Sequence, residues 1–388
     1  MMVTQQEPNG AALSIRLNRQ PSFPRGGPSP PAMAAGPPLP KKRCLRRPAR
    51  RLAGLLGVLA GLSALPFLAG GGYEELLSRA LLPLLLPAGS PEPSAAAAFP
   101  PPLPASFSLS PPACGPSSAA VPGLLVLVPS APEHGARRSA VRRSWGSARE
   151  AGGLTVRTVF ALGLPREASV QEALEREAAE HGDLLQGRFA DTYGNLTLKT
   201  LAMLGWAASR CPGARFVLKA DDDVFVNLPG LARHLRALQE EEPGGTPAVY
   251  LGRLHWRVAP DRDPGSRHYV PARLYPPPAF PPYCSGTAYV LSGRAASAVL
   301  AASRHLPLVP VEDVFVGLCA RRAGLIPRHS ARLAGSARYP PDACCYRELL
   351  FSVHGVSPGR MVAMWADPCR VQCLGRLFGG VPRPKEAS

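Results

Sequence analysis

Short apolar runs and segments with helical periodicity alternate along the middle of the 388-residue chain. The apolar runs predict buried strands at 124–128, 156–162 and 215–219. The segments between and after them place apolar residues at helical spacing and predict helices at 137–145, 170–181, 196–210 and 228–239. This alternation is typical of an α/β domain with a mainly parallel sheet, in which ligands bind at the carboxyl ends of the strands.

Three consecutive aspartates, Asp221–Asp223, stand at such a place, because they follow the strand at 215–219 and precede a second apolar run at 224–226. Carboxylates clustered at the end of a buried strand are costly unless a cation binds there. Oxygen ligands suit a hard divalent ion such as Mg²⁺ or Mn²⁺, which can in turn hold a diphosphate. A solvated Asp-rich turn is the alternative, and the flanking strands together with Lys219 favour the metal site.

Three further segments contain side chains suited to catalysis or sugar binding. Glu312 and Asp313 open an apolar helix. Acids in a first turn commonly interact with the helix dipole, but Asp313 beside a buried run also suits a positioned base. The segment 283–289 combines a turn with aromatic side chains, which suits stacking on a sugar ring, and a strand with a glycine bulge is its alternative. His354 ends another apolar strand, where a lone histidine is more often structural unless a metal is near.

The charge distribution separates the N-terminal part from the rest. Residues 1–51 contain ten Lys or Arg and one acid, so about half of the formal net charge of +17 lies there. The next 21 residues, 52–72, carry no charge and are long enough to span a bilayer. The basic residues before them predict a cytosolic tail at 1–51 and a type II signal anchor at 52–72. A buried core helix is the weaker alternative, because a Pro- and Ala-rich tract follows. The basic pI therefore indicates topology rather than nucleic-acid binding.

The remainder of the chain divides by composition. Residues 73–121 are rich in Pro and Ala and predict an extended stem that buries no core. A folded lumenal domain is expected at 122–375 and a C-terminal tail at 376–388. Residues 1–40 lack periodicity and predict disorder, and Met33 is an alternative start of translation.

The cysteines and one glycosylation sequon agree with a secretory compartment. Cys44 lies in the predicted tail, where it is either free or palmitoylated. The other eight cysteines lie beyond the anchor and lack the paired spacing of a zinc site, so disulfides are expected, without a defined connectivity. Asn195-Leu-Thr197 is a sequon that is used only in a secretory compartment, which predicts glycosylation of Asn195.

Taken in order, six segments resemble the β-1,3-glycosyltransferase family of Golgi enzymes. They lie at 137–146, 195–200, 215–227, 281–292, 311–324 and 352–358, and the resemblance spans about 122–366. It implies a GT-A fold, in which a nucleotide-binding α/β half is fused to an acceptor-binding half. It also implies an inverting, metal-dependent transferase that is anchored in the Golgi membrane with its catalytic domain in the lumen.

The resemblance assigns roles to single residues. Asp221, Asp223 and His354 match the metal site, with Mn²⁺ as the expected ion. Asp313 matches the general base. The side chains expected at the nucleotide are Arg138, Arg142, Lys219, Asp221 and Asp222. Those expected near the substrate sugars are Trp256, Tyr283 and Glu312. Cys284 and Cys319 occupy positions that look disulfide-bonded to each other in relatives.

The resemblance also implies a reaction. Within the family, further segments are similar to the branch that transfers galactose from UDP-galactose to the 3-hydroxyl of a terminal N-acetylgalactosamine on ganglio-series glycosphingolipids. These segments lie at 73–78, 250–258, 264–268, 308–317 and 333–346. A transferase that moves N-acetylglucosamine or galactose onto glycoprotein glycans is one alternative, and a catalytically inactive lectin or chaperone is another. The expected partners are a UDP-sugar, a glycolipid acceptor, the Golgi membrane, and further copies of this chain or other Golgi glycosyltransferases, but no nucleic acid.

Overall fold

The computed structural model describes residues 107–115, 121–240, 248–333 and 349–367, together with Ala80, Leu81 and Leu84. All of these residues belong to one compact unit, which lies within residues 58–388. The predicted cytosolic tail, signal anchor and C-terminal tail therefore lie outside the described residues. Within the described part, no helix is long and apolar enough to cross a bilayer.

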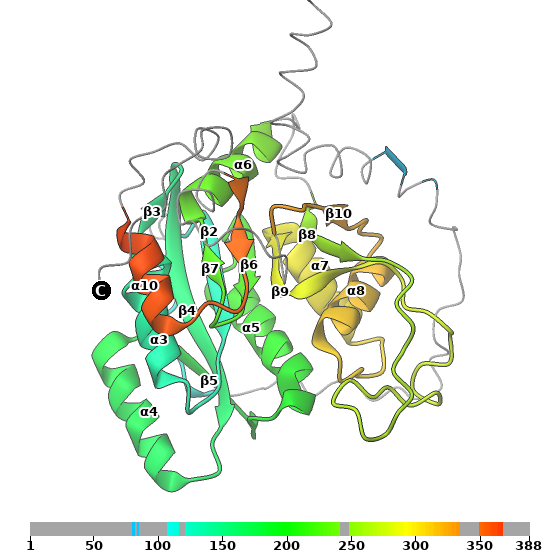
Figure 1. The fold of residues 1–388 in the computed structure, drawn as a ribbon, viewed down its shortest axis with the longest axis horizontal. Coiled ribbons are helices and arrows are strands. Elements are labelled where there is room, and N and C mark those ends of the chain that lie inside the picture. Colours follow the sequence, from blue (N-terminus) through cyan, green and yellow to red (C-terminus); the bar gives the residue numbers. More distant parts are fainter. Residues whose placement is uncertain are drawn as a thin grey trace, which may run out of the picture. The chain divides into compact units, whose positions relative to one another are not determined.

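A nine-stranded mixed sheet forms the centre of the domain, with eight strands in the order β1-β5-β4-β2-β6-β9-β8-β10 and β3 paired with β4 (Figure 1). The strands are β1 Phe107–Leu109, β2 Leu124–Pro129, β3 Glu150–Ala151, β4 Leu154–Leu164, β5 Leu184–Ala190, β6 Phe216–Ala220, β8 Tyr250–His255, β9 Tyr283–Ser292 and β10 Arg328–His329. The central strands β5, β4, β2 and β6 are parallel, which confirms the parallel centre predicted from the sequence. Strand β9 is antiparallel to both β6 and β8, so the segment 283–289 is part of a strand.

Helices pack on both faces of this sheet (Figure 1). They are α3 Gly135–Arg142, α4 Ala168–His181, α5 Leu196–Arg210, α6 Leu228–Glu240, α7 Gly293–Ser303, α8 Glu312–Arg322 and α10 Pro358–Ala366. The helix expected at 137–145 ends at Arg142, and a 3₁₀ turn follows at Trp145–Ser147. The other three predicted helices are confirmed to within two residues at each end.

Two apolar clusters, one on each side of the sheet, explain the apolar runs. Helices α3, α6 and α10 contribute to one cluster, and α5, α7 and α8 contribute to the other. Within β2, Leu124 and Val126 belong to the first cluster, whereas Leu125 and Leu127 belong to the second. This strand is continuously apolar because both of its faces are buried.

The folded domain begins earlier than the composition predicts. Residues 107–115, which the Pro- and Ala-rich pattern assigned to the stem, are docked on the domain. Strand β1 pairs with β5, and a disulfide joins Cys114 to Cys211 at the end of α5. The indole N–H of Trp206 donates to the Ser110 hydroxyl at 3.2 Å. These contacts were not visible in the sequence, because each partner lies far away along the chain.

The expected disulfide between Cys284 and Cys319 is not formed. Both residues are free thiols in the structure. Both side chains are fully buried, and burial raises the pKa of each thiol. Cys284 lies on β9 against Gly252 of β8, and its side chain fills the space that the missing glycine side chain leaves. The general expectation of disulfides is nevertheless confirmed by the Cys114–Cys211 bond.

Candidate active site

The three aspartates form a tight turn at the carboxyl end of the central strand β6, as the sequence predicts. The backbone N–H of Asp221 donates to the Thr287 carbonyl of β9 at 3.1 Å, and the N–H of Val224 closes the turn on the Asp221 carbonyl at 3.1 Å. The chain then enters β7, Phe225–Val226, which pairs antiparallel with β11, Ser352–Val353. This pairing brings the segment after β11 alongside the aspartate turn.

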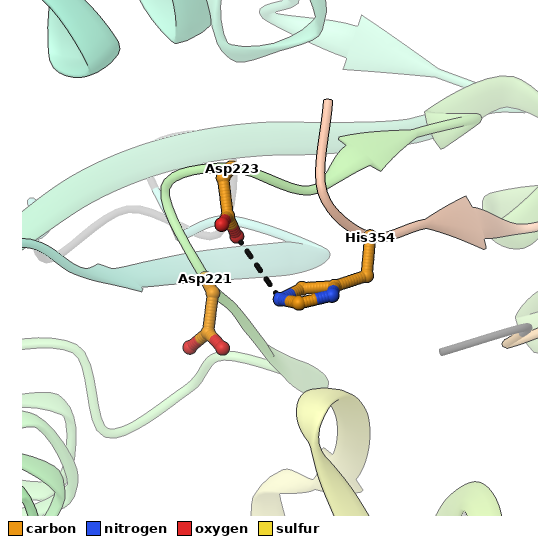
Figure 2. A group of neighbouring side chains, drawn as sticks. All are labelled: Asp221, Asp223 and His354. Carbon is orange, nitrogen blue, oxygen red and sulfur yellow. Dashed lines mark ion pairs between the residues drawn. The ribbon is translucent and has the colours of Figure 1, made fainter. Parts of the chain in front are cut away.

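As a result, Asp221, Asp223 and His354 converge (Figure 2). One potential ligand atom from each residue lies within 4.8 Å of the other two, and His354 Nε2 is 3.4 Å from Asp223 Oδ1. All three side chains are partly exposed, so an ion can reach them from solvent. Two carboxylates and one imidazole are donors that suit Mn²⁺ and similar divalent ions. The residues predicted to bind the metal therefore fit such an ion, and His354 lies beside the two aspartates rather than alone at the end of its strand.

The middle aspartate has a different role. Asp222 is 5% exposed and binds protein groups on both of its oxygens. It accepts hydrogen bonds from the Ser130 hydroxyl at 2.8 Å and from Arg137 Nη1 at 3.0 Å, and His134 Nδ1 lies 2.7 Å away. Asp222 therefore ties the loop after β2 and helix α3 to the aspartate turn, and the structure does not direct it toward the metal ligands.

Lys219 connects the aspartate turn to the first turn of α8. Its ammonium group is buried and donates to Asp221 Oδ1 at 2.6 Å and to the Gly286 carbonyl, and it lies 3.7 Å from Glu312 Oε2. Burial lowers the pKa of Lys219, but the negative charges of Asp221 and Glu312 outweigh it, so the pKa is raised overall. Lys219 thus neutralises two carboxylates of the protein, and its expected contact with the phosphates of the nucleotide stays a prediction.

The two acids that open α8 lie in different surroundings. Glu312 is 3% exposed and accepts hydrogen bonds from the hydroxyls of Tyr289 at 2.7 Å and Thr200 at 2.9 Å, and burial raises its pKa. Asp313 is only half-buried; its Oδ2 accepts the Gly286 N–H at 2.9 Å and its Oδ1 accepts the Val314 N–H at 2.9 Å. Of the two, Asp313 is the carboxylate that a substrate can reach.

A cavity of about 280 Å³ contains the three metal-binding candidates and is lined by further polar side chains. Two of these, Arg137 and Lys199, were not identified from the sequence. Arg137 Nη1 lies 3.0 Å from Asp222 and 3.4 Å from Asp223. Lys199 is buried, donates to the Ser130 carbonyl at 2.6 Å and pairs with Asp191 at 2.8 Å, and burial lowers its pKa. A lysine on the apolar face of the predicted helix 196–210 was the available signal for it.

A galactosyltransferase family model matches residues 136–331, which is half of the chain and contains the aspartate turn, Asp313 and the cavity-lining helices. β-1,3-Galactosyltransferase 4 from Mus musculus is 45% identical over 315 residues, an alignment that covers 75% of this chain and 83% of that protein. The chain belongs to the galactosyltransferase family. The family predicted from the six sequence segments is thereby confirmed.

Two more relatives show that the proteins similar to this chain include transferases of different sugars. β-1,3-Galactosyltransferase 4 from Homo sapiens is 44% identical over 322 residues, which covers 75% of this chain and 83% of that protein. The acetylgalactosaminyl-O-glycosyl-glycoprotein β-1,3-N-acetylglucosaminyltransferase from Homo sapiens is 45% identical over 255 residues, which covers 62% of this chain and 65% of that protein. The protein is therefore a hexosyltransferase that binds a nucleotide-sugar donor and an acceptor glycan. The mixed sheet with its parallel centre fits the GT-A fold.

Arg138 and Arg142, two arginines of α3, bind other acids rather than the three aspartates. Arg138 is 1% exposed and donates to Glu177 at 2.7 and 2.8 Å and to the Ala131 carbonyl at 2.6 Å. Arg142 donates to Asp183 at 2.9 Å and to Glu177 at 2.7 Å. The two residues are one helical turn apart, so both face α4, whereas Arg137 is rotated toward the aspartates. Both arginines therefore form ion pairs within the protein, and the nucleotide contacts expected of them stay predictions.

The residues expected near the sugars are separated by their burial. Tyr283 is 7% exposed and its ring packs 5.1 Å from that of His255, so it belongs to the core. Trp256, which follows β8, is 38% exposed and remains accessible. Asn195 directly precedes α5, and its side chain donates to the Ala190 carbonyl at 2.9 Å. Glycosylation of Asn195 stays a prediction.

Proposed function

We propose that the protein transfers galactose from UDP-galactose to the 3-hydroxyl of a terminal N-acetylgalactosamine on ganglio-series glycosphingolipids, with inversion at the anomeric carbon. The observation that carries the proposal is the convergence of Asp221, Asp223 and His354 in one cavity, with the reachable carboxylate of Asp313 linked to them through Lys219 and Gly286. The similarity to β-1,3-galactosyltransferase 4 over three quarters of the chain supports galactose as the sugar.

Asp221, Asp223 and His354 would hold Mn²⁺ in this enzyme, because their donor atoms match that ion. A divalent ion at this place supplies positive charge that offsets the charge developing on the leaving diphosphate. The neighbouring Lys219 reduces the repulsion between Asp221 and Glu312, so that the aspartate turn keeps its shape before the ligand arrives. Asp222 also helps to fix the shape of the aspartate turn, because it accepts hydrogen bonds from Ser130 and from Arg137 of α3.

Asp313 is the proposed general base. The acceptor hydroxyl gives its proton to the Asp313 carboxylate while its oxygen bonds to the anomeric carbon, and the bond from that carbon to the diphosphate oxygen breaks to release UDP. The N–H groups of Gly286 and Val314 donate to the two oxygens of this carboxylate and so fix its orientation. General-base assistance of this kind is worth roughly 10²–10⁴ in rate.

The experiment is a transfer assay with the full-length protein in detergent, supplied with Mn²⁺ and one UDP-sugar at a time. The acceptors are a ganglio-series glycolipid ending in N-acetylgalactosamine and a glycopeptide carrying N-acetylgalactosamine. We expect β-1,3-linked galactose on the glycolipid, identified by mass spectrometry and linkage-specific glycosidases. Absence of transfer from every UDP-sugar contradicts an enzyme of this kind.

A second candidate is supported by the glycoprotein-directed relative, which is as similar in identity as the galactosyltransferases although over a shorter alignment. In that case the donor is UDP-N-acetylglucosamine and the acceptor is the N-acetylgalactosamine of a glycoprotein. The same assay separates the candidates, because this one predicts transfer of N-acetylglucosamine to the glycopeptide and none of galactose to the glycolipid.

We also propose that the protein is a type II membrane protein of the Golgi, held by residues 52–72, and that it associates with itself or with other Golgi glycosyltransferases. The charge-free segment after the basic tail and the sequon at Asn195 support this location. In intact Golgi vesicles, protease should spare residues 122–366, and peptide N-glycosidase should reduce the mass of the protein. Cleavage of the domain in sealed vesicles would contradict the topology.

A further inference from the structure

A second cavity, of about 410 Å³, lies apart from the aspartate turn and has no part in the mechanism above. It shares no lining residue with the cavity at the aspartates. Thr158 of β4 lines it, and the register of the central strands places Thr158 level with Leu218 of β6, through Val126 of β2. Leu218 precedes Asp221 by three residues, or roughly 10 Å of extended strand. The two cavities are therefore separate sites.

The second cavity lies at a gap on the edge of β4. Strand β3 pairs with the first two residues of β4, and β5 pairs with it from Phe160 onward. Before the gap, the backbone N–H of Val156 donates to the Arg149 carbonyl at 2.8 Å. After the gap, the N–H of Phe160 donates to the Asp183 carbonyl at 2.9 Å. Because alternate backbone groups of a strand point to the same side, the N–H of Thr158 points into this gap, where no described strand pairs with it.

The side chain of Thr158 carries a polar atom without a partner. Thr158 is 7% exposed, and its hydroxyl oxygen is buried and makes no hydrogen bond within the described part of the chain. Thr155 on the same strand differs, because its hydroxyl accepts the N–H of Gly123 at 2.8 Å. An unpaired buried hydroxyl is unfavourable, and a hydrogen-bond acceptor bound in the cavity would remove this penalty.

Two arginines that line the cavity have no acidic partner among the described residues. The side chain of Arg149 is exposed. Arg157 is half-buried and donates to Cys114 Sγ at 3.3 Å and to the Pro112 carbonyl at 2.5 Å, which leaves further donors of its guanidinium unused. Burial and the like charge of Arg149 lower the pKa of Arg157. The two cations thus repel each other beside the cavity, and an anion between them would relieve this repulsion.

The carboxylate in the cavity wall does not compensate these two cations. Arg142 donates to both oxygens of Asp183, each at 2.9 Å. Glu177 is in turn bound by Arg138 and Arg142. These two arginines and two acids form a neutral cluster. The positive charge that the cavity offers to a ligand therefore comes from Arg149 and Arg157.

We propose that this cavity binds a phosphate group, held by the guanidinium groups of Arg149 and Arg157 and by the N–H and hydroxyl of Thr158. Guanidinium groups form strong charge-assisted hydrogen bonds with phosphate. Donors that approach from several directions suit a tetrahedral oxyanion better than a planar carboxylate. Because Arg157 also holds Pro112 and Cys114, a bound phosphate stabilises the docked segment 107–115 on the domain. The site is independent of the proposed transfer reaction.

The test measures binding of inorganic phosphate by the full-length protein in detergent, with EDTA present so that no divalent ion recruits phosphate to the aspartates. Melting temperatures are measured by tryptophan fluorescence and Kd by calorimetry, against sodium chloride at equal ionic strength. Arg143, an exposed arginine that does not line the cavity, provides the matched control Arg143→Gln. We expect phosphate to stabilise the wild type and this control equally. Arg149→Gln should weaken phosphate binding about tenfold, because a charge-assisted hydrogen bond is lost.

Thr158→Val tests the strand side of the site. Valine keeps the shape of the side chain and removes the unpaired hydroxyl, so the variant should be at least as stable as the wild type without phosphate. It should bind phosphate several-fold more weakly, because one hydrogen bond to the ligand is lost. Thr158→Ser keeps the hydroxyl and should bind phosphate like the wild type. Equal Kd values of the wild type and Thr158→Val contradict the role of this hydroxyl.

Two further arms identify the source of the phosphate group. With the protein in phosphatidylcholine nanodiscs, glycerol 3-phosphate represents a soluble monoester, and phosphatidic acid added to the bilayer represents a lipid head group. A rise in melting temperature with either one that is lost in Arg149→Gln supports the site and names its source.

Three results overturn the site. The first is a wild type that phosphate stabilises no more than chloride does. The second is a stabilisation that Arg149→Gln retains in full, which indicates a general salt effect. The third is an equal loss of binding in Arg143→Gln, which indicates a dependence on net charge alone.

Discussion

Lys219 holds the centre of the site together, and replacing it with methionine tests that role. Methionine fills a similar volume without charge, so the change removes the cation and leaves the carboxylates of Asp221 and Glu312 in place. Glu312 is 2% exposed in its side chain and lies 3.7 Å from the ammonium group. Asp221 is 2.6 Å away but 31% exposed, so water compensates part of its loss. The main penalty therefore comes from Glu312.

The size of the effect follows from the burial of this pair. At 3.7 Å, two unit charges attract by about 4 kcal/mol with an effective dielectric constant of 20, and desolvation of both groups offsets part of this. Removing one partner of a buried pair destabilises proteins by about 3–5 kcal/mol, because the other charge is left uncompensated. We expect a loss near the lower end, about 3 kcal/mol, since Glu312 keeps its hydrogen bonds from Tyr289 and Thr200.

The pH dependence gives the prediction its sign. Without Lys219, the folded-state pKa values of both carboxyls rise further above their unfolded values, so the folded variant binds more protons than the unfolded chain. Such groups make stability fall as pH rises through the folded pKa. The destabilisation caused by Lys219→Met should therefore be larger at pH 7.5 than at pH 5.

Urea unfolding of the wild type and the variant, followed by tryptophan fluorescence at both pH values, measures this effect. The double variant Lys219→Met/Glu312→Gln should recover most of the loss, because the unpaired charge is gone. Arg236→Met, which breaks an exposed pair with Glu240 at 3.5 Å, should cost less than about 1 kcal/mol. A Lys219→Met variant as stable as the wild type, or equally destabilised at both pH values, would refute the reasoning.

Three further changes test the site and the fold. Asp313→Asn should keep Mn²⁺-dependent UDP binding in calorimetry but lower turnover by roughly 10²–10⁴, and a turnover near that of the wild type would remove Asp313 from the mechanism. Asp223→Ala should abolish Mn²⁺-dependent UDP binding, whereas unchanged affinity would contradict its role as a ligand. Cys114→Ser opens a disulfide between residues 97 positions apart and should lower the free energy of unfolding by about 2–5 kcal/mol, with Cys319→Ser as the control that leaves this bond intact.

The comparison of sequence and structure is clearest at the aspartate turn. The apolar run before Asp221 and the one after Asp223 correctly located a buried strand, a turn and a cluster of oxygen ligands, because strand burial on both faces leaves a local signature. The helix at 196–210 was predicted with the observed bounds for the same kind of reason. The structure adds that Asp313 is more exposed than the buried Glu312, which agrees with the choice of Asp313 as the base, but its catalytic role stays a prediction.

The contacts of the arginines could not be predicted in this way. Arg137, Arg138 and Arg142 belong to one basic helix, and their sequence shows only that they lie within five positions of one another. Which of them meets the aspartates depends on how α3 is rotated against the sheet and against α4. That rotation is set by packing, and it directs Arg138 to Glu177 and Arg137 to Asp222.

By itself, the sequence of this protein determined its α/β character, the place of the aspartate turn and the segments that mark its family, since these depend on local periodicity and on short motifs. Only the tertiary structure decided that β7–β11 pairing brings His354 to Asp223, that Cys114 pairs with Cys211, and that Cys284 stays reduced. The physical reason is the same in each case. Contacts between residues far apart in the chain depend on sheet order and helix packing, which no short stretch of sequence contains.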